Sequence, residues 1–274
     1  MKIKLLTIIV LIFTLNNFVA LTAIYSKEIK QKSINPLVIS DLLMGGTINN
    51  IWVDNDKMSK MIKGGEVYQV YDFSKYLGYG KGSKIEIEES AGAQWIEIKT
   101  KGKKIDDYIA IGGKWNIYPR KITQQSLNDN NCKNIVKEVL QKNGLKNVKI
   151  ILKQNYSVDI DGDGSEEVFI TASNIDYNDL KTEIVKNTYS IIILRKIINN
   201  KAENIVLQKS IYADNKSFEE GCSTIYKIDY IADLNNDGVM EVVAEDKYYE
   251  GMGYTVIEIK GDKVKEALSN GWGL

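Results

Sequence analysis

Two short acidic segments carry the side chains best suited to chemistry in this sequence. The first loop runs from Asp159 to Glu167 and the second loop from Asp233 to Glu241, 74 residues further along the chain. Alternate residues of a tight loop can direct their oxygens toward one point, so this spacing predicts two cation sites. The candidate ligands stand at positions one, three, five and nine of each loop, and they are Asp159, Asp161, Asp163 and Glu167 in the first loop and Asp233, Asn235, Asp237 and Glu241 in the second.

The type of donor favours calcium. Carboxylate and amide oxygens in a flexible loop suit Ca²⁺, whereas Mg²⁺ prefers a rigid octahedron. The chain has no histidine, and neither loop has a cysteine to favour zinc or copper. We expect tighter binding at the first loop, because it offers four carboxylates where the second offers three and an amide. The alternative is a metal-free turn in which Asp and Gly merely satisfy the backbone, although crowded carboxylates then repel one another.

The surroundings of the loops indicate β-hairpins. An EF-hand would need flanking helices and an acid at position twelve, where this chain has Ile170 and Ala244. Apolar, strand-like segments enter and leave each loop instead. The pattern resembles the calcium-binding hairpin loops of FG-GAP and related VCBS repeats, known from integrin-α-like β-propellers and many exported bacterial proteins. The resemblance covers roughly residues 145–274 and implies two calcium ions, although the family usually has aspartate at position nine and this chain has glutamate.

The remaining pattern predicts a mainly β protein with one connecting helix. Short segments rich in isoleucine, valine and tyrosine follow one another through residues 145–274, which we interpret as the two-repeat calcium-loop module. A β-rich module of unknown type is expected at 37–122, and an amphipathic helix at 127–144. Two repeats cannot close a propeller of four or more blades, so we expect blade-like sheets in an open or partial arrangement, or a sandwich with the first module.

Two finer predictions concern residues 37–122. A short helix is expected from Asp54, as its N-cap, to Gly64. Alternating apolar and charged residues at Trp95–Lys99, followed by a turn, predict a hairpin with Tyr108–Ile111.

The amino terminus indicates export. Lys2 and Lys4 precede an apolar run, so residues 1–26 are interpreted as a secretory signal. The signal is either cleaved or kept as an anchor, because residues 5–25 are long enough to span a bilayer. We therefore expect an extracellular or cell-envelope location. Such a compartment permits a disulfide between Cys132 and Cys222, and a buried free thiol at Cys132 is the alternative.

Composition restricts the possible functions. The chain has 36 basic and 36 acidic residues and no histidine. The lack of histidine excludes Ser-His and Cys-His nucleophiles, and the balanced charge argues against nucleic acid. A pair of carboxylates acting on a glycan is the enzymatic mechanism that this composition still allows, with candidate acids at Glu86, Glu88, Glu97 and Glu250.

A binding or structural role is the preferred interpretation, and we do not expect an enzyme. Aromatic side chains could offer flat surfaces to a cell-surface glycan or protein partner. The candidates are Trp52, Trp95, Trp115, Tyr248, Tyr249 and Trp272. A basic cluster at Lys99, Lys101, Lys103 and Lys104 is expected to be solvated and to protect a strand edge. The sequence thus predicts an exported, calcium-stabilised β-repeat protein of the cell envelope.

Overall fold

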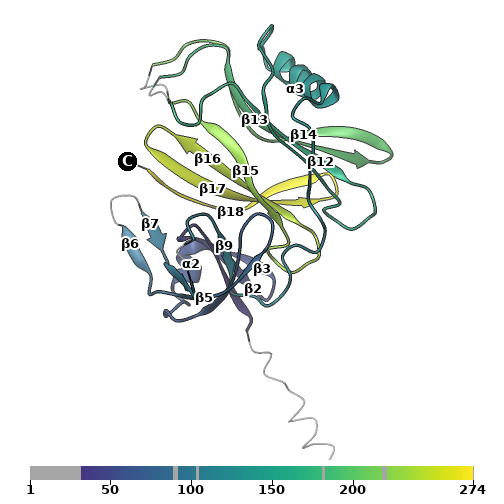
Figure 1. Ribbon diagram of the computed structural model, residues 1–274. Helices are drawn as coiled ribbons and strands as arrows, with labels where there is room; N and C mark the ends of the chain where they lie inside the picture. The colour runs from purple at the N-terminus through teal and green to yellow at the C-terminus, as the bar shows by residue number, and fades with distance from the viewer. Residues whose placement is uncertain (1–31, 89–91, 103–104, 181–182, 218–220, 274) are drawn as a thin grey trace, which may run out of the picture. The chain divides into compact units, whose positions relative to one another are not determined.

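The computed structural model describes residues 32–273, apart from 89–91, 103–104, 181–182 and 218–220 (Figure 1). As predicted, the fold is mainly β. The expected signal at residues 1–26 lies outside the described residues, and so do Lys103 and Lys104. Within the described part of the chain, no helix has the length and apolar character needed to cross a membrane.

The first sheet is antiparallel and follows the order β6-β7-β2-β1-β9-β4-β5-β8, with β3 paired to β2. Its strands are β1 (Ile34–Ile39), β2 (Leu42–Ile48), β3 (Ile51–Asp54), β4 (Val67–Tyr71), β5 (Tyr76–Gly82), β6 (Glu86–Glu88), β7 (Ala93–Trp95), β8 (Ile98–Thr100) and β9 (Ile109–Ile111).

The predicted hairpin between Trp95–Lys99 and Tyr108–Ile111 is wrong. Strand β8 pairs with β5, whereas β9 lies between β1 and β4. All three residues of β9 are buried, which suits a central strand bonded on both sides better than one arm of an edge hairpin.

The predicted short helix is present but ends early. Helix α2 (Asn55–Ser59) begins at the expected N-cap, where the Asp54 carboxylate accepts the backbone N–H of Lys57. Ile62 is nevertheless buried in the same core cluster as Met58, so the chain beyond the helix continues to pack against the first sheet.

Two further sheets are simple antiparallel meanders. The second sheet follows the order β10-β11-β12-β13-β14, and the third follows β15-β16-β17-β18. Their strands are β10 (Thr123–Gln124), β11 (Leu152–Val158), β12 (Glu167–Ser173), β13 (Thr188–Ile198), β14 (Lys201–Tyr212), β15 (Ile225–Ala232), β16 (Glu241–Tyr248), β17 (Gly251–Lys260) and β18 (Lys263–Gly273). Strands β11 to β14 of the second sheet and β15 to β18 of the third each follow one another in chain order, and each strand pairs with the next.

The predicted connecting helix is α3 (Asn130–Lys142), and Asp129 caps its amino end. Ile135, Val136 and Leu140 lie on its buried face and pack with Ile170 and Ile191 of the second sheet. The helix therefore covers one face of that sheet, as the ribbon shows (Figure 1).

The other face of the second sheet packs on the third. Phe169 and Leu194 share a core cluster there with Val242 and Ile257. The opposite face of the third sheet packs on the first sheet. Residues Ile34–Leu274 accordingly form one compact unit, and the two predicted modules share a hydrophobic core.

Candidate metal centres

The first loop joins β11 to β12, and the pairing of Val158 with Glu167 closes the hairpin. The Asp159 carboxylate holds the turn by accepting the backbone N–H of Gly162 at 2.7 Å and that of Gly164 at 3.0 Å. Both glycines have positive φ angles, 78° and 89°, which a side chain would disfavour. The predicted hairpin loop is therefore present, with its glycines where the turn needs them.

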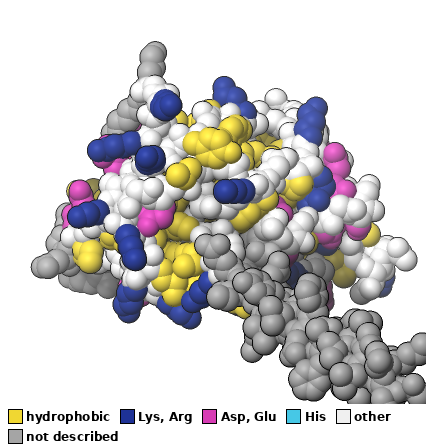
Figure 2. Space-filling model, turned by 90° about the horizontal axis from the view of Figure 1, so that it is seen from below, with side chains coloured by type: hydrophobic (Ala, Val, Ile, Leu, Met, Phe, Trp, Pro, Cys, Tyr) yellow, Lys and Arg dark blue, Asp and Glu magenta, His cyan; other side chains and the backbone are white. Residues whose placement is uncertain are grey.

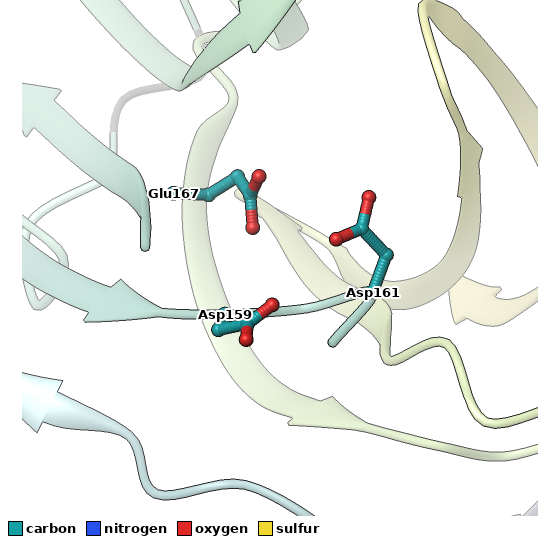
Figure 3. A group of neighbouring side chains, drawn as sticks. All are labelled: Asp159, Asp161 and Glu167. Carbon is teal, nitrogen blue, oxygen red and sulfur yellow. The ribbon is translucent and has the colours of Figure 1, made fainter. Parts of the chain in front are cut away.

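Three of the four predicted ligands of the first loop come together. Carboxylate oxygens of Asp159, Asp161 and Glu167 lie within 4.8 Å of one another. Figure 3 shows these carboxylates turned toward a common space. Asp163 is not part of the group, because its Oδ1 accepts the backbone N–H of Ser165 at 2.7 Å.

A lysine that the motif does not contain enters this group. Lys196 is on β13, and its Nζ donates to Asp161 Oδ2 at 2.7 Å and to Glu167 Oε1 at 2.6 Å. The lysine side chain is only 4% exposed and that of Glu167 only 2%. Burial disfavours the charged ammonium, but the hydrogen bonds and charges of the two carboxylates together raise the pKa of Lys196. The first loop is thus an ion-paired centre.

The second loop joins β15 to β16 in the same way, with Ala232 paired to Glu241. Its acidic group consists of Asp237, Glu241 and Glu258, whose oxygens lie within 4.8 Å of one another. Glu258 comes from β17 and was not predicted. Of the predicted ligands, Asp233 lies outside the group and accepts the backbone N–H groups of Asn236 and Gly238.

The Asn235 side chain lies inside this second group. Its amide nitrogen donates to Glu241 Oε1 at 3.0 Å and to Asp237 Oδ2 at 3.2 Å. Glu241 therefore has a neutral amide donor, whereas Glu167 of the first loop has an ammonium.

The charge balance of the second group differs from that of the first. Glu241 is fully buried, and burial raises its pKa to about 9, with the charges of Asp237 and Asp233 adding to the effect and a hydrogen bond from the backbone N–H of Leu234 opposing it. Lys260 lies at the rim, 2.9 Å from Glu258 and 3.3 Å from Asp237. Its side chain is 56% exposed, so its charge is largely screened by water. The buried carboxylate is thus compensated far less than Glu167.

Arg120 ties the two loops together and was also missed by sequence reasoning. Its guanidinium donates to the carbonyl of Ile160 at 2.5 Å and to that of Gly238 at 2.6 Å. The backbone N–H of Met240 also donates to Ile160, at 2.8 Å. The two candidate centres are therefore neighbours, linked through the backbone of each loop.

The acids considered for glycan chemistry do not gather. Glu86 and Glu88 are exposed on β6, and Glu97 is paired with Lys99 at 3.1 Å. Neither these three nor Glu250 belongs to an acidic group of the described residues.

The predicted aromatic surfaces are divided between core and exterior. Trp52, Trp95 and Trp115 pack against the core between the first and third sheets. Tyr249 and Trp272 are 53% and 38% exposed. An open hollow of about 320 Å³ lies at the end of the third sheet, lined by Asp246, Tyr248, Asn270 and Trp272 among others.

A second hollow lies on the first sheet. It has a volume of about 840 Å³ and an apolar lining that includes Val67, Leu77 and Tyr79, with Lys81, Lys99 and Lys101 around it. Figure 2 shows the face seen from below, where hydrophobic side chains lie among Lys and Arg. Strand β8, which carries Lys99, is an edge strand.

Cys132 and Cys222 are both free. Cys132 lies on the buried face of α3, where burial raises the pKa of its thiol, and its Sγ lies 3.8 Å from Asn155 Oδ1. The free-thiol alternative therefore describes this pair.

The described residues thus contain two acidic groups that could each hold a metal ion. In comparisons with known proteins, no family model, no curated protein and no solved structure matches this chain. A buried ammonium lies among the oxygens of the first group, whereas the lysine beside the second group is 56% exposed.

Proposed function

We propose that this chain is an exported β-repeat protein of the FG-GAP/VCBS type, stabilised by calcium at its second loop, with a binding or structural role in the cell envelope. One observation carries the proposal. Glu241 is fully buried and is gathered with Asp237 and Glu258, all three offering oxygens within 4.8 Å of one another.

Electrostatics supports a cation at this point. Several carboxylates in a small, poorly solvated volume repel one another, and burying one of them without a partner is costly. The raised pKa of Glu241, about 9, expresses this cost. A divalent cation among the oxygens would allow all three carboxylates to be ionised together, because it supplies the missing positive charge.

The available donors suit calcium. Asp237, Glu241 and Glu258 supply carboxylate oxygens. The amide oxygen of Asn235, which accepts the backbone N–H of Asp237 at 2.9 Å, would join them if the amide rotated and gave up that bond. These are hard oxygen ligands in a loop that ends on a strand, the combination that Ca²⁺ accepts at distances of about 2.3–2.6 Å. The exposed Lys260 can swing into solvent when an ion binds.

The position of the second loop gives calcium a structural role. The indole N–H of Trp52 donates to Glu258 at 3.1 Å, and that of Trp115 donates to the carbonyl of Asp233 at 2.8 Å. A cation there would therefore strengthen the contact between the third and first sheets. At about 1 mM calcium outside the cell, a site with a dissociation constant of ~10 μM would add ~2.7 kcal/mol to the free energy of unfolding.

For the binding role, two surfaces are candidates. The hollow beside Tyr248 and Trp272 combines aromatic rings with the polar groups of Asp246 and Asn270, which suits a sugar. The larger hollow beside Tyr79 is apolar with lysines around it and suits a protein partner that carries acidic residues.

Thermal unfolding of the full-length protein with calcium and with chelator tests the proposal. Calcium should raise the melting temperature by roughly 5–10 °C, and Asp237→Asn should abolish this shift. Asp262→Asn is the matched control, because Asp262 is an exposed acid in the β17–β18 turn and should leave the shift unchanged. Equal melting temperatures of the wild-type protein in both conditions would refute the metal site.

A further inference from the structure

The strand that carries Lys196 directs this side chain between two sheets. Ile192 and Leu194 of β13 belong to the core shared by the second and third sheets. Because alternate residues of a strand share a face, Lys196 points to the same side. The last paired residues of β12 and β13 are Val168 and Arg195, so Lys196 lies next along the strand, opposite Glu167.

The geometry of the lysine is that of a cation in a site. Its Nζ lies 2.7 Å from Asp161 and 2.6 Å from Glu167. These distances are close to the roughly 2.3–2.6 Å at which Ca²⁺ binds carboxylate oxygens. A divalent ion held by the same two oxygens would lie almost on the ammonium, and the two positive charges would repel each other strongly with little water between them.

We propose that Lys196 is the built-in cation of the first loop, taking the place of a divalent ion, so that this loop holds its acidic residues together without metal. The residues of the first loop therefore do not fit the calcium ion that their spacing implies. The inference concerns a different loop from the proposed calcium site and does not depend on that site being occupied.

The second repeat shows what the same position looks like without a lysine. Val242 of β16 pairs with Ile257 of β17, so Glu258 lies next along the strand, opposite Glu241. The position that holds a lysine in the first repeat thus holds a further acid in the second. The replacement changes the local charge by two units, which is the charge that a divalent ion carries.

Calcium titration of full-length variants tests this inference in the background Asp237→Asn, which removes a ligand of the second loop. In this background, the melting temperature should be the same in chelator and in millimolar calcium. Addition of Lys196→Met should lower it by roughly 6–15 °C in chelator, because two acids lose their buried partner. Calcium should then restore much of the loss, since the vacated position can accept an ion.

Two results would overturn the inference. One is a calcium-dependent melting temperature in the Asp237→Asn protein that disappears when Asp161→Asn is added, because the first loop would then bind an ion with its lysine in place. The other is a Lys196→Met variant that melts in chelator like its parent.

A charge-matched variant covers the case in which Lys196→Met does not fold. Lys196→Met combined with Glu167→Gln removes the ammonium and one carboxylate together, so its melting temperature in chelator should recover most of the loss. Failure of this pair to fold would contradict a purely electrostatic role for the lysine. A wild-type protein insensitive to calcium would refute the proposed function but agree with a first loop that needs no metal.

Discussion

The two acidic loops have nearly the same sequence pattern and cap the same kind of hairpin. The strand that follows each hairpin, however, gives the two loops partners of opposite charge. The first loop faces Lys196 on β13, and the second faces Glu258 on β17. Each centre also lies in a seam between sheets, because Glu167 is on the Phe169 face of β12 and Glu241 on the Val243 face of β16. A loop motif alone therefore does not decide which cation it holds. We propose that the residue opposite, on the neighbouring strand, decides it.

The largest expected difference concerns the two lysines. Lys196→Met should lower the free energy of unfolding by ~3–5 kcal/mol in chelator, because it leaves buried acids without a partner. Lys260→Met is the matched variant in the second loop and should cost less than ~1 kcal/mol, because this lysine is 56% exposed. Chemical denaturation in chelator measures both. Equal losses would remove the distinction between the loops.

The next effect is that of calcium on the wild-type protein. Saturating the second loop should add ~2.7 kcal/mol at an ion concentration a hundred times the dissociation constant. Asp237→Asn should remove this gain, whereas Asp161→Asn should keep it, although it weakens the protein at all calcium concentrations. Denaturation curves with and without calcium measure the gain. The reverse pattern would assign the ion to the first loop.

A third lysine, outside both loops, shows how a partly exposed ammonium affects the pKa of a neighbouring acid. Lys227 contacts Asp229 at 3.0 Å and Glu245 at 2.9 Å, and its side chain is 38% exposed. Burial and then the charge of Glu245 raise the pKa of Asp229 to about 6. Lys227 counteracts this shift only in part, and its side chain is far more exposed than that of Lys196, which is 4% exposed.

This shift predicts a pH dependence. Because the pKa of Asp229 is higher in the folded protein than in the unfolded chain, its proton stabilises the fold fully below about pH 4. The stabilisation is lost as the pH rises through about 6. Asp229→Asn should therefore reduce the fall in unfolding free energy between pH 4 and 7 by ~2 kcal/mol, as measured by denaturation at each pH. An unchanged pH profile would contradict the raised pKa.

The smallest effect is expected from a substitution that makes the second loop more like the first. Asn235→Asp gives it the same four acidic positions, and removes the amide that now bonds to Asp237 and Glu241. The calcium-dependent gain in unfolding free energy should increase by ~1 kcal/mol, because the metal-free form is more strained and the ion has another carboxylate. Calorimetric titration of both proteins measures the change. Weaker calcium binding by the variant would argue against Asn235 as a ligand.

Sequence patterns predicted the local features well. Apolar segments on both sides of each loop indicated hairpins, and the pairs Val158–Glu167 and Ala232–Glu241 close them. Helix α3, from Asn130 to Lys142, lies within the residues 127–144 that its pattern indicated. Such features depend on residues close together in the chain, where turn and periodicity rules apply.

The partners of the loops could not be predicted in the same way. Lys196 is 29 residues from Glu167 along the chain, and a bulge at Ile192 and Ile193 shifts the register of β13 against β14. One signal was present, because Lys196 follows Ile192 and Leu194 at the period of a strand face. The sequence alone did not tell which face of β13 lies between two sheets. Strand β9 was misplaced for a similar reason, because it pairs with β1 and β4, which are distant from it in the chain.

A crystal structure of the full-length protein grown with calcium, with the ions located by their anomalous scattering, tests the central claim most directly. It should contain one ion bound by Asp237, Glu241 and Glu258, with Lys196 still between Asp161 and Glu167. An ion among Asp159, Asp161 and Glu167, with the lysine displaced, would contradict the claim that the two loops use different cations.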